Sequence, residues 1–315
     1  SEVLSVPTER YPSCDDGLRA QIPPHANVTR TWAPDLSKSL SVRGRYPGFL
    51  TFPDRYWPWC LSAVRAGLRI IREQKVEAIF ATSPVPSALL IGLLLKRLTG
   101  LPLIIDFRDP WVDNATPPVR RFFESWLERR FMRGADRIIC NTPALRRNFL
   151  GRYPEVPPER FVTITNGYDE RDFADLDVPP SPHFEIIYAG MLQREHRNPD
   201  PLLRAVRLAL DRGWIERGDL HLSFLGADRW GGSQEFADRL AELGLTELTE
   251  VRPERIGYRD SLRRMAAASV LLVLLHGEGQ KEEVERNREW WGLTVPAKVY
   301  EYLRIARQMM VIVDG

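Results

Sequence analysis

The stretch AIFATSPVPSALLIGLLLKRLTGLPLIIDF, residues 78–107, decides the fold class. Two short runs rich in β-branched residues, 78–83 and 101–107, flank a longer segment with helical spacing, 87–100. A strand, a helix and a second strand in this order form a βαβ unit, which is typical of a parallel sheet. Gly100 falls where the helix should end, and we expect it to form the helix C-cap.

The same alternation continues along the chain. A helix over 120–135, with Gly134 at its expected C-cap, separates 101–107 from further strands at 136–142 and 160–167. A proline-rich segment, 175–183, then interrupts the pattern and predicts an interdomain linker. The rhythm restarts with predicted strands at 184–190, 220–226, 270–277 and 309–315. We therefore predict an α/β protein of two Rossmann-like domains facing across a cleft, residues 1–175 and 176–315.

The composition excludes several classes of protein. The 315 residues are 43% hydrophobic and 27% charged, and the formal net charge of +2 provides no overall basic field for nucleic acid. Cys14, Cys60 and Cys140 lack the paired spacing of zinc sites or disulfide frameworks, which favours a reducing cytoplasm. The longest apolar run, 87–95, is far shorter than the ~20 residues of a spanning helix. We expect no nucleic-acid partner, no metal and no transmembrane segment.

Ligands of such sheets bind outside the carboxyl ends of the strands, and polar or turn-forming residues occur at these ends. In the first half the candidates are Ser83, Asp106, Arg108, Asp109 and Asn141. In the second half they are Gly190, Gly226 and His276. His276 has two interpretations: it lines the ligand site, or it is simply a hydrogen-bonded residue, as a lone histidine often is.

The segment GLTVPAKVYEYL, residues 292–303, predicts a further helix that begins with polar groups. Pro296 suits the first turn and Thr294 suits the cap. Lys298 and Glu301 then share one face near the helix N-terminus, where a nucleoside diphosphate would be favoured, and Glu301 could accept hydrogen bonds from ribose hydroxyls. The alternative is a capped surface helix with an (i, i+3) ion pair.

The segment VPAKVYEYL also resembles the nucleotide-sugar motif of bacterial GT-B glycosyltransferases, especially the retaining family 4 group. Further segments resemble that group in the same order, namely 52–59, 80–111, 135–154, 164–169 and 186–203. The resemblance covers most of the chain from about residue 50.

The resemblance implies metal-independent transfer of a sugar, with retention, from a UDP-, GDP- or dTDP-sugar to an envelope polysaccharide, lipid-linked or natural-product acceptor. The first domain would bind the acceptor through the residues at its strand ends, with Asp109 as a catalytic candidate. The second would bind the donor, with Glu301 on the ribose and Lys298 assisting. Arg197, with Arg194 as second choice, is the catalytic candidate that neutralises the departing diphosphate.

Two positions depart from the family pattern. Leu293 stands where a second glutamate usually contacts the donor sugar, and Met191 replaces an arginine expected after Gly190. These departures keep two alternatives open: a nucleotide-sugar binding or scaffold protein without activity, and a sugar-nucleotide epimerase of the same architecture. The family's first strand, its glycine-rich loop and its last helices also have no counterpart, so we expect a truncated polypeptide.

Four other segments have two interpretations each. Residues 276–292 predict either a solvated loop or a lid over the donor. The helix within 117–137 carries an apolar side flanked by arginines, so it either covers the sheet or docks on an anionic membrane, which would place the protein in the cytoplasm or at the inner membrane face. The loop 106–111 is either a salt-bridged turn or part of the acceptor site. The triplet Asp175-Leu176-Asp177 matches a metal-binding motif of the other large glycosyltransferase fold, but its place in a linker indicates chance.

Overall fold

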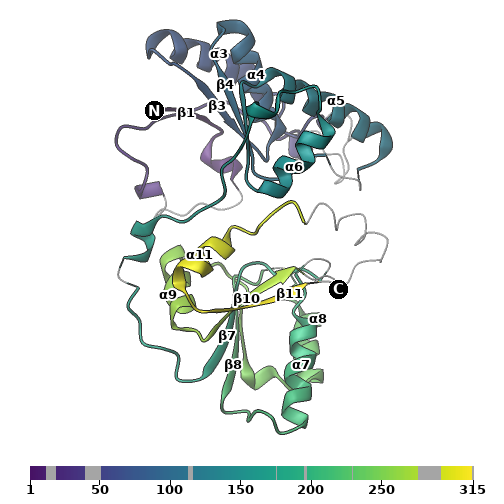
Figure 1. Cartoon of the computed structure of the whole chain (residues 1–315). Coiled ribbons are helices and arrows are strands. Elements are labelled where there is room, and N and C mark those ends of the chain that lie inside the picture. The colour runs from purple at the N-terminus through teal and green to yellow at the C-terminus, as the bar shows by residue number, and fades with distance from the viewer. Residues whose placement is uncertain are drawn as a thin grey trace. The chain divides into compact units, whose positions relative to one another are not determined.

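The computed structural model describes residues 1–11, 19–39, 51–112, 116–174, 176–194, 197–228, 230–275 and 292–313. The chain divides into two compact units (Figure 1). The first comprises Ser1–Thr165 and the described part of Arg286–Thr294, and the second comprises Asn166–Glu285 and Val295–Gly315. Cys14, His276 and most of the lid candidate 276–292 lie outside the described residues.

The first unit contains a four-stranded parallel sheet of order β3-β4-β5-β6 and a separate parallel pair, β1 and β2. Its strands are β1 Glu2–Ser5, β2 Asn27–Arg30, β3 Ile79–Thr82, β4 Leu103–Phe107, β5 Arg137–Cys140 and β6 Phe161–Thr163. Its helices are α2 Leu36–Ser39, α3 Trp59–Glu73, α4 Pro86–Thr99, α5 Pro118–Gly134 and α6 Pro143–Arg152, with short 3-10 turns at Thr8–Arg10 and Pro158–Arg160.

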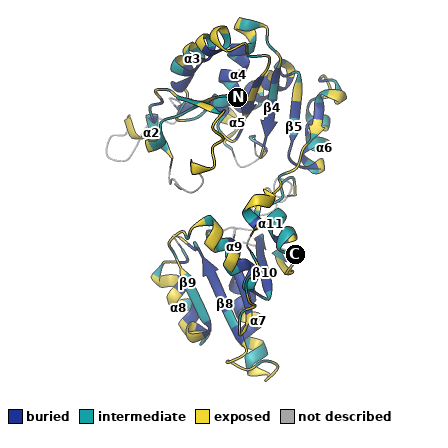
Figure 2. Ribbon diagram, turned by 90° about the vertical axis from the view of Figure 1, so that its left-hand side faces the viewer, coloured by how far each residue is buried: buried dark blue, intermediate teal, exposed yellow. Residues whose placement is uncertain are grey.

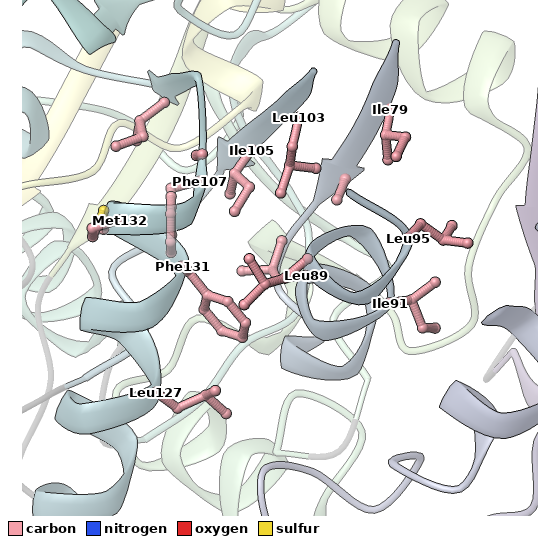
Figure 3. Close-up of a cluster of buried hydrophobic side chains, with 14 of the residues drawn as sticks. Ile79, Leu89, Ile91, Leu95, Leu103, Ile105, Phe107, Leu127, Phe131 and Met132 are labelled. Carbon is pink, nitrogen blue, oxygen red and sulfur yellow. The ribbon is translucent and has the colours of Figure 1, made fainter. Parts of the chain in front are cut away.

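The core of the first unit forms between β4 and the helices that cover it (Figure 3). Leu103, Ile105 and Phe107 of β4 are fully buried, as is Phe131 of α5. Strands of a parallel sheet are covered on both faces, so a continuous apolar run is expected there in place of an alternating pattern. The 78–107 stretch therefore supplies the centre of this unit.

The second unit is one five-stranded parallel sheet of order β11-β10-β7-β8-β9. The strands are β7 Phe184–Ala189, β8 Leu220–Leu225, β9 Thr249–Arg252, β10 Val270–Leu275 and β11 Gln308–Val313. The helices are α7 Asp200–Asp211, α8 Gln234–Glu242, α9 Tyr258–Ala267 and α11 Lys298–Ile305, with 3-10 turns at Glu170–Phe173 and Thr246–Leu248. Figure 2 shows the buried strands of both units in dark blue.

The strand order of the second sheet reverses next to β7. The chain enters at β7, adds β8 and β9 on one side, and then returns to add β10 and β11 on the other. Such a reversal opens a crevice at the carboxyl ends of the two strands beside it, here β7 and β10. The topology thus marks the end of β7 as the place in this unit where a ligand is expected.

A charged network joins three strands of the second unit to α9. The buried carboxylate of Glu185 on β7 accepts a 2.5 Å hydrogen bond from Ser223 on β8. Arg264 of α9 lies 3.3 Å from Glu185 and 2.6 Å from Glu250 of β9. The hydrogen bond from Arg264 lowers the pKa of Glu250 to about 2, against the opposing effect of burial. The network therefore holds α9 against the sheet.

The predicted α/β class, with a parallel sheet in each half of the chain, is confirmed, and so are the predicted strands, apart from their ends. Gly100 is the C-cap of α4 with φ +76°, as expected. The prediction for Gly134 is wrong, because the glycine is the last helical residue and Ala135 is the C-cap of α5. A Cβ at Gly134 would collide with the Leu93 side chain, so close packing explains this glycine. Strand β9 was not expected, because its sequence TEVR alternates charged and uncharged residues and lacks an apolar run.

The apolar residues of α5 separate into two sets. Leu127, Phe131 and Met132 are buried against the sheet. Phe122 is 67% exposed and Trp126 is 48% exposed. The single apolar side expected from the sequence is therefore only partly correct: half of it covers the sheet, and the other half faces solvent.

Candidate functional site

Lys298 joins the start of α11 to the carboxyl end of β7. Its Nζ donates a 2.7 Å hydrogen bond to the carbonyl oxygen of Ala189 and lies 3.8 Å from the ring centroid of Tyr188. Burial, together with the positive charge of Arg197, lowers the pKa of Lys298 to about 7, and the negative charge of Glu301 opposes both effects. An ammonium group that has lost its water and lies beside another cation is stabilised by an approaching anion.

Gly190 leaves the space that this ammonium group occupies. The glycine follows the last residue of β7 and has φ +143°, a conformation that other residues rarely adopt. A Cβ built on Gly190 would lie 2.8 Å from the Lys298 Nζ and 3.6 Å from the Tyr188 hydroxyl oxygen. The backbone N–H of Gly190 donates to the carbonyl of Leu225 at 2.8 Å, which fixes the turn. Glycine is therefore required here on two grounds, conformation and space.

Glu301 lies one turn into α11 and accepts a 2.9 Å hydrogen bond from the Tyr258 hydroxyl through Oε1. Burial raises the pKa of Glu301, and the Tyr258 hydrogen bond and the Lys298 charge oppose this. Glu301 and Lys298 form no ion pair, because each contacts a different element, α9 and β7 respectively. The arrangement differs from a simple surface ion pair and leaves the second carboxylate oxygen of Glu301 without a hydrogen bond to any described residue.

The predicted start of this helix is wrong. The helix begins at Lys298, and its N-cap, Ala297, makes no side-chain hydrogen bond. Pro296 precedes the helix, with its carbonyl accepting from the N–H of Val299 at 3.0 Å, and Thr294 caps nothing. The reason is that the chain before the helix is held elsewhere: Thr294 belongs to the first unit.

Leu293, the departure from the family pattern, contributes to the first unit. Its side chain packs against that unit's hydrophobic core. Its carbonyl accepts a 2.5 Å hydrogen bond from the hydroxyl of Thr142, which also accepts from the backbone N–H of Leu145 as the N-cap of α6. An apolar residue at 293 therefore has a packing role in this chain.

The two arginine candidates have different surroundings. Arg197 pairs with Gln193 through two backbone hydrogen bonds of 2.9 and 3.4 Å, and its charge acts on both Lys298 and Tyr188. Arg194 instead donates to Glu235 at 2.7 Å. It lines a surface pocket together with Trp230, Asp200 and further charged residues. The structure thus brings Arg197 and not Arg194 to Lys298. Gly226 directly follows β8 and has φ +64°, and a Cβ built on it would meet nothing within 4 Å.

The candidates of the first unit form one hydrogen-bonded group at the ends of β3, β4 and β5. Asp106 accepts from the Thr82 hydroxyl at 2.8 Å and lies 3.6 Å from the Arg108 guanidinium. The hydroxyl oxygen of Ser83 accepts from the backbone N–H of Arg108 at 2.9 Å, and the Asn141 side chain donates to the Arg108 carbonyl. Four of the five predicted residues therefore meet around Arg108.

Two side chains of this rim, those of Asn141 and Asp109, have properties that suit contact with a ligand. The side-chain oxygen of Asn141 is buried and has no hydrogen-bond partner in the described part of the chain. A buried polar atom without a partner is costly and often marks a position where a ligand or water completes the site. Asp109 lies on the loop after β4, where burial raises the pKa of its carboxyl group and Arg108 opposes this effect. A raised pKa suits a carboxylate that accepts a proton.

Sequence reasoning missed Tyr188 and Tyr258. Tyr188 lies inside the segment 186–203 that had been noted, yet nothing in its spacing indicates that its ring supports an ammonium group. Tyr258 begins α9, 43 residues before Glu301, and long-range pairs of this kind leave no local pattern. Neither could have been found from periodicity.

No group of three or more His, Cys, Asp and Glu side chains among the described residues could hold a metal ion. No helix in this part of the chain is long and apolar enough to cross a membrane.

Comparison with known proteins gives the family context. The family described as "Glycosyl transferase 4-like domain" matches residues 3–167, just over half of the chain. A D-inositol 3-phosphate glycosyltransferase from Arthrobacter sp. (strain FB24) is 31% identical over 159 residues, which are 46% of this chain. That match spans only 36% of the relative's own length.

Solved structures share the fold. Sucrose-phosphate synthase from Thermosynechococcus elongatus matches 94% of this chain and 68% of its own, with TM-score 0.57 and 14% identity. Anabaena Alr3699/HepE, solved in complex with UDP and glucose, matches 80% of this chain and 62% of its own, with TM-score 0.53 and 14% identity. The N-terminal domain of Candida albicans trehalose-6-phosphate phosphatase matches 90% and 71%, with TM-score 0.58 and 13% identity. At these identities the similarity establishes the two-unit α/β fold of GT-B proteins alone.

Proposed function

Because the chain belongs to the family of glycosyl transferase 4-like domains, we propose that it transfers a sugar from a nucleoside diphosphate sugar to an acceptor. One observation carries this proposal: the ammonium group of Lys298 lies at the carboxyl end of β7, where the strand order of the second sheet reverses. A cation at such a crevice is suited to a diphosphate.

The donor is assigned to the second unit. Lys298 and Arg197 neutralise the diphosphate, and Gly190 leaves room for the Lys298 ammonium group at the end of β7. Glu301 accepts hydrogen bonds from the ribose hydroxyls through the carboxylate oxygen that Tyr258 leaves unused. UDP and UDP-glucose, which Anabaena Alr3699/HepE binds, support a uridine nucleotide as the first donor to try.

The acceptor is assigned to the first unit, at the rim around Arg108. In the transfer, the bond between the anomeric carbon and the diphosphate oxygen breaks, and the diphosphate keeps the electron pair. The same carbon forms a bond to an acceptor hydroxyl oxygen, and the hydroxyl proton passes to a base, for which we assign Asp109. Asn141 orients the acceptor through its unpartnered oxygen.

Finer features of the activity rest on the family resemblance. We propose retention of configuration, no metal, and an envelope polysaccharide, a lipid-linked sugar or a natural product as acceptor. The curated relative, a D-inositol 3-phosphate glycosyltransferase, supports a polyol or sugar phosphate as a further acceptor to test.

The test of donor binding compares Glu301→Gln with wild type in thermal unfolding against UDP-, GDP- and dTDP-sugars. A ligand at about 100 times its Kd stabilises a protein by about 2.7 kcal/mol, which is readily measured. We expect stabilisation by one nucleotide class, weakened in Glu301→Gln and unchanged in Glu247→Gln, a change to an exposed glutamate of the same unit. No stabilisation of the folded protein by any nucleotide sugar would contradict the proposal.

Release of the nucleoside diphosphate in the presence of acceptors then tests turnover. Nucleotide-sugar binding without release, across sugar, polyol phosphate and lipid-linked acceptors, would favour a binding or scaffold protein. This alternative rests on Leu293 and Met191, the two positions at which the chain departs from the family pattern. The anomeric configuration of the product, read by NMR, tests retention.

We also propose a peripheral contact with an anionic membrane, made from the cytoplasmic side through α5. Val119, Phe122, Phe123 and Trp126 of this helix are 48% to 73% exposed, and arginines flank them. Exposed apolar side chains beside basic residues suit the membrane interface.

In vesicle flotation, the double variant Val119→Ser, Phe122→Ser should bind anionic vesicles less than wild type does. Trp214→Ser, at a 66% exposed tryptophan of the second unit, should bind as wild type does. Equal binding by all three proteins would contradict this contact.

A further inference from the structure

A strongly basic pocket lies between the ends of α4 and α5 in the first unit. It has a volume of about 570 Å³. We call this cavity the basic pocket. Six cationic side chains line it, those of Lys96, Arg97, Arg129, Arg130, Arg133 and Arg160. Trp126 also lines it, and the Arg130 guanidinium stacks on the Trp126 ring at 4.5 Å.

The positive charge of the basic pocket is only partly neutralised. Lys96 forms an ion pair with Asp136. Arg129 and Arg133 share one carboxylate, that of Glu155, at 2.9 and 3.3 Å. Six cations thus face two carboxylates, and the partial negative charge at the ends of α4 and α5, roughly half a unit each, removes only part of the excess.

Three of the arginines form no ion pair with a described residue, and two of them, Arg97 and Arg130, also make no hydrogen bond to one. Arg97, on the last turn of α4, makes no hydrogen bond or ion pair there, and Arg130 makes only the stacking contact with Trp126. Arg160 instead points to the end of α5, where it donates to the carbonyls of Arg133 and Ala135 at 3.4 and 3.3 Å. Like charges gathered without partners repel each other, so a bound anion would stabilise them.

The basic pocket lies at the amino edge of the sheet. Asp136 directly precedes β5, and Arg160 directly precedes β6. Ser83, Asp106 and Asn141 lie at or just beyond the carboxyl ends of β3, β4 and β5. The basic pocket and the acceptor rim are thus at opposite edges of one sheet, and an anion in the pocket is a ligand additional to the donor and the acceptor.

We propose that the basic pocket binds a phosphate-bearing ligand. Guanidinium groups match phosphate in a bidentate manner, and several of them together favour a multiply charged anion over a single carboxylate. Arg97 and Arg130 contact the phosphate, and Trp126 holds the Arg130 guanidinium in place. The proposal does not depend on the glycosyltransferase activity.

Phosphate of this kind has two sources, a soluble polyphosphate or the headgroup of an anionic lipid. Phe122 and Trp126 are exposed on the same helix, which makes the lipid source physically reasonable. Two arms of one experiment separate them. The soluble arm titrates inorganic pyrophosphate by calorimetry, and the lipid arm measures flotation with phosphatidylcholine vesicles with and without phosphatidylglycerol.

The variant is Arg97→Gln, Arg130→Gln, which changes two exposed residues without breaking an ion pair. Its matched control is Arg212→Gln, which removes an arginine stacked at 4.7 Å on an exposed tryptophan, Trp214, of the second unit. A third protein, Lys298→Met, removes the donor-site cation. Lys298→Met should still bind pyrophosphate in the basic pocket, because Lys298 does not line that pocket. This variant therefore separates a wrong assignment of the donor site from a wrong assignment of the basic pocket.

We expect the double variant to bind pyrophosphate, anionic vesicles or both at least about tenfold more weakly than wild type, since charge-assisted hydrogen bonds are lost. Arg212→Gln should bind as wild type does. Weakened pyrophosphate binding identifies a soluble ligand, and weakened vesicle binding alone identifies a lipid headgroup. Absence of binding in both arms, or equal binding by the double variant and its control, would overturn the proposal.

Discussion

A Cβ on Gly190 would lie 2.8 Å from the Nζ of Lys298, although 108 residues separate the two in the chain. Because Gly190 has no side chain, the space beside it is open to the Lys298 ammonium group. This pair links the end of β7 to the start of α11 and is the geometric centre of the candidate donor site.

Gly190→Ala should impair both stability and nucleotide binding. The φ of +143° is strained for alanine, which costs about 1 to 3 kcal/mol, and the added methyl group displaces the Lys298 ammonium. Urea unfolding and UDP-sugar titration measure the two effects. The control is Gly151→Ala in α6, where a Cβ meets nothing within 4 Å and the substitution should stabilise the helix slightly. Equal stability of the two variants would contradict the strain argument.

Lys298→Met should stabilise the protein most at low pH. The folded-state pKa of about 7 lies below the unfolded value of about 10.4, so the unfolded chain binds more protons between these values. The cost of burying the ammonium group is thus complete below about pH 7 and disappears as the pH rises to about 10.4. Unfolding free energies across this range should show a gain that shrinks with pH. Lys38→Met, at an exposed lysine, should show no such trend.

Two phenylalanines of α5 should respond in opposite ways to truncation. Phe131 is fully buried, so Phe131→Ala should cost about 3 to 5 kcal/mol in unfolding free energy. Phe122 is 67% exposed, so Phe122→Ala should change it by about 0.5 kcal/mol or less. Denaturant unfolding of both variants measures the contrast. A large cost at Phe122 would show that the exposed half of α5 is covered in solution.

Glu250→Gln should lower stability at neutral pH but not in strong acid. The folded pKa of about 2 lies below the usual 4.5, so the stabilisation is present above about pH 4.5 and is lost as the pH falls towards 2. We expect Glu250→Gln to lower the unfolding free energy by about 2 kcal/mol near pH 7, and by progressively less below about pH 4.5. A difference independent of pH would mean that packing, and not the Arg264 hydrogen bond, explains the cost.

Local pattern was sufficient to predict most strands of the two larger sheets, but not β9. The apolar runs of β4 and β10 are buried on both faces, and such runs are visible in sequence without knowledge of their neighbours. Gly100 was predictable because an αL cap depends on one residue alone. Gly134 was not, since its role depends on Leu93, a residue of another helix.

The candidate site could be predicted only in part for the same reason. The candidates of the first unit lie at the ends of β3, β4 and β5, so the topology of the sheet alone brings Ser83, Asp106 and Asn141 together. The partners of Lys298 and Glu301, by contrast, are a carbonyl and a hydroxyl from distant elements. The start of α11 was misplaced because the first unit, through Thr142 and Leu293, holds the chain before it.

The wide separation of Gly190 and Lys298 along the chain has a consequence for protein synthesis. The ribosome makes β7, β8, β9 and β10 before α11, so the ammonium group at the centre of the candidate donor site emerges after these four strands. A nascent chain that ends before Lys298 thus lacks the cation at the switch point, whatever the state of its sheet. Nucleotide capture by ribosome complexes stalled at successive positions would then report where along the chain the candidate donor site forms.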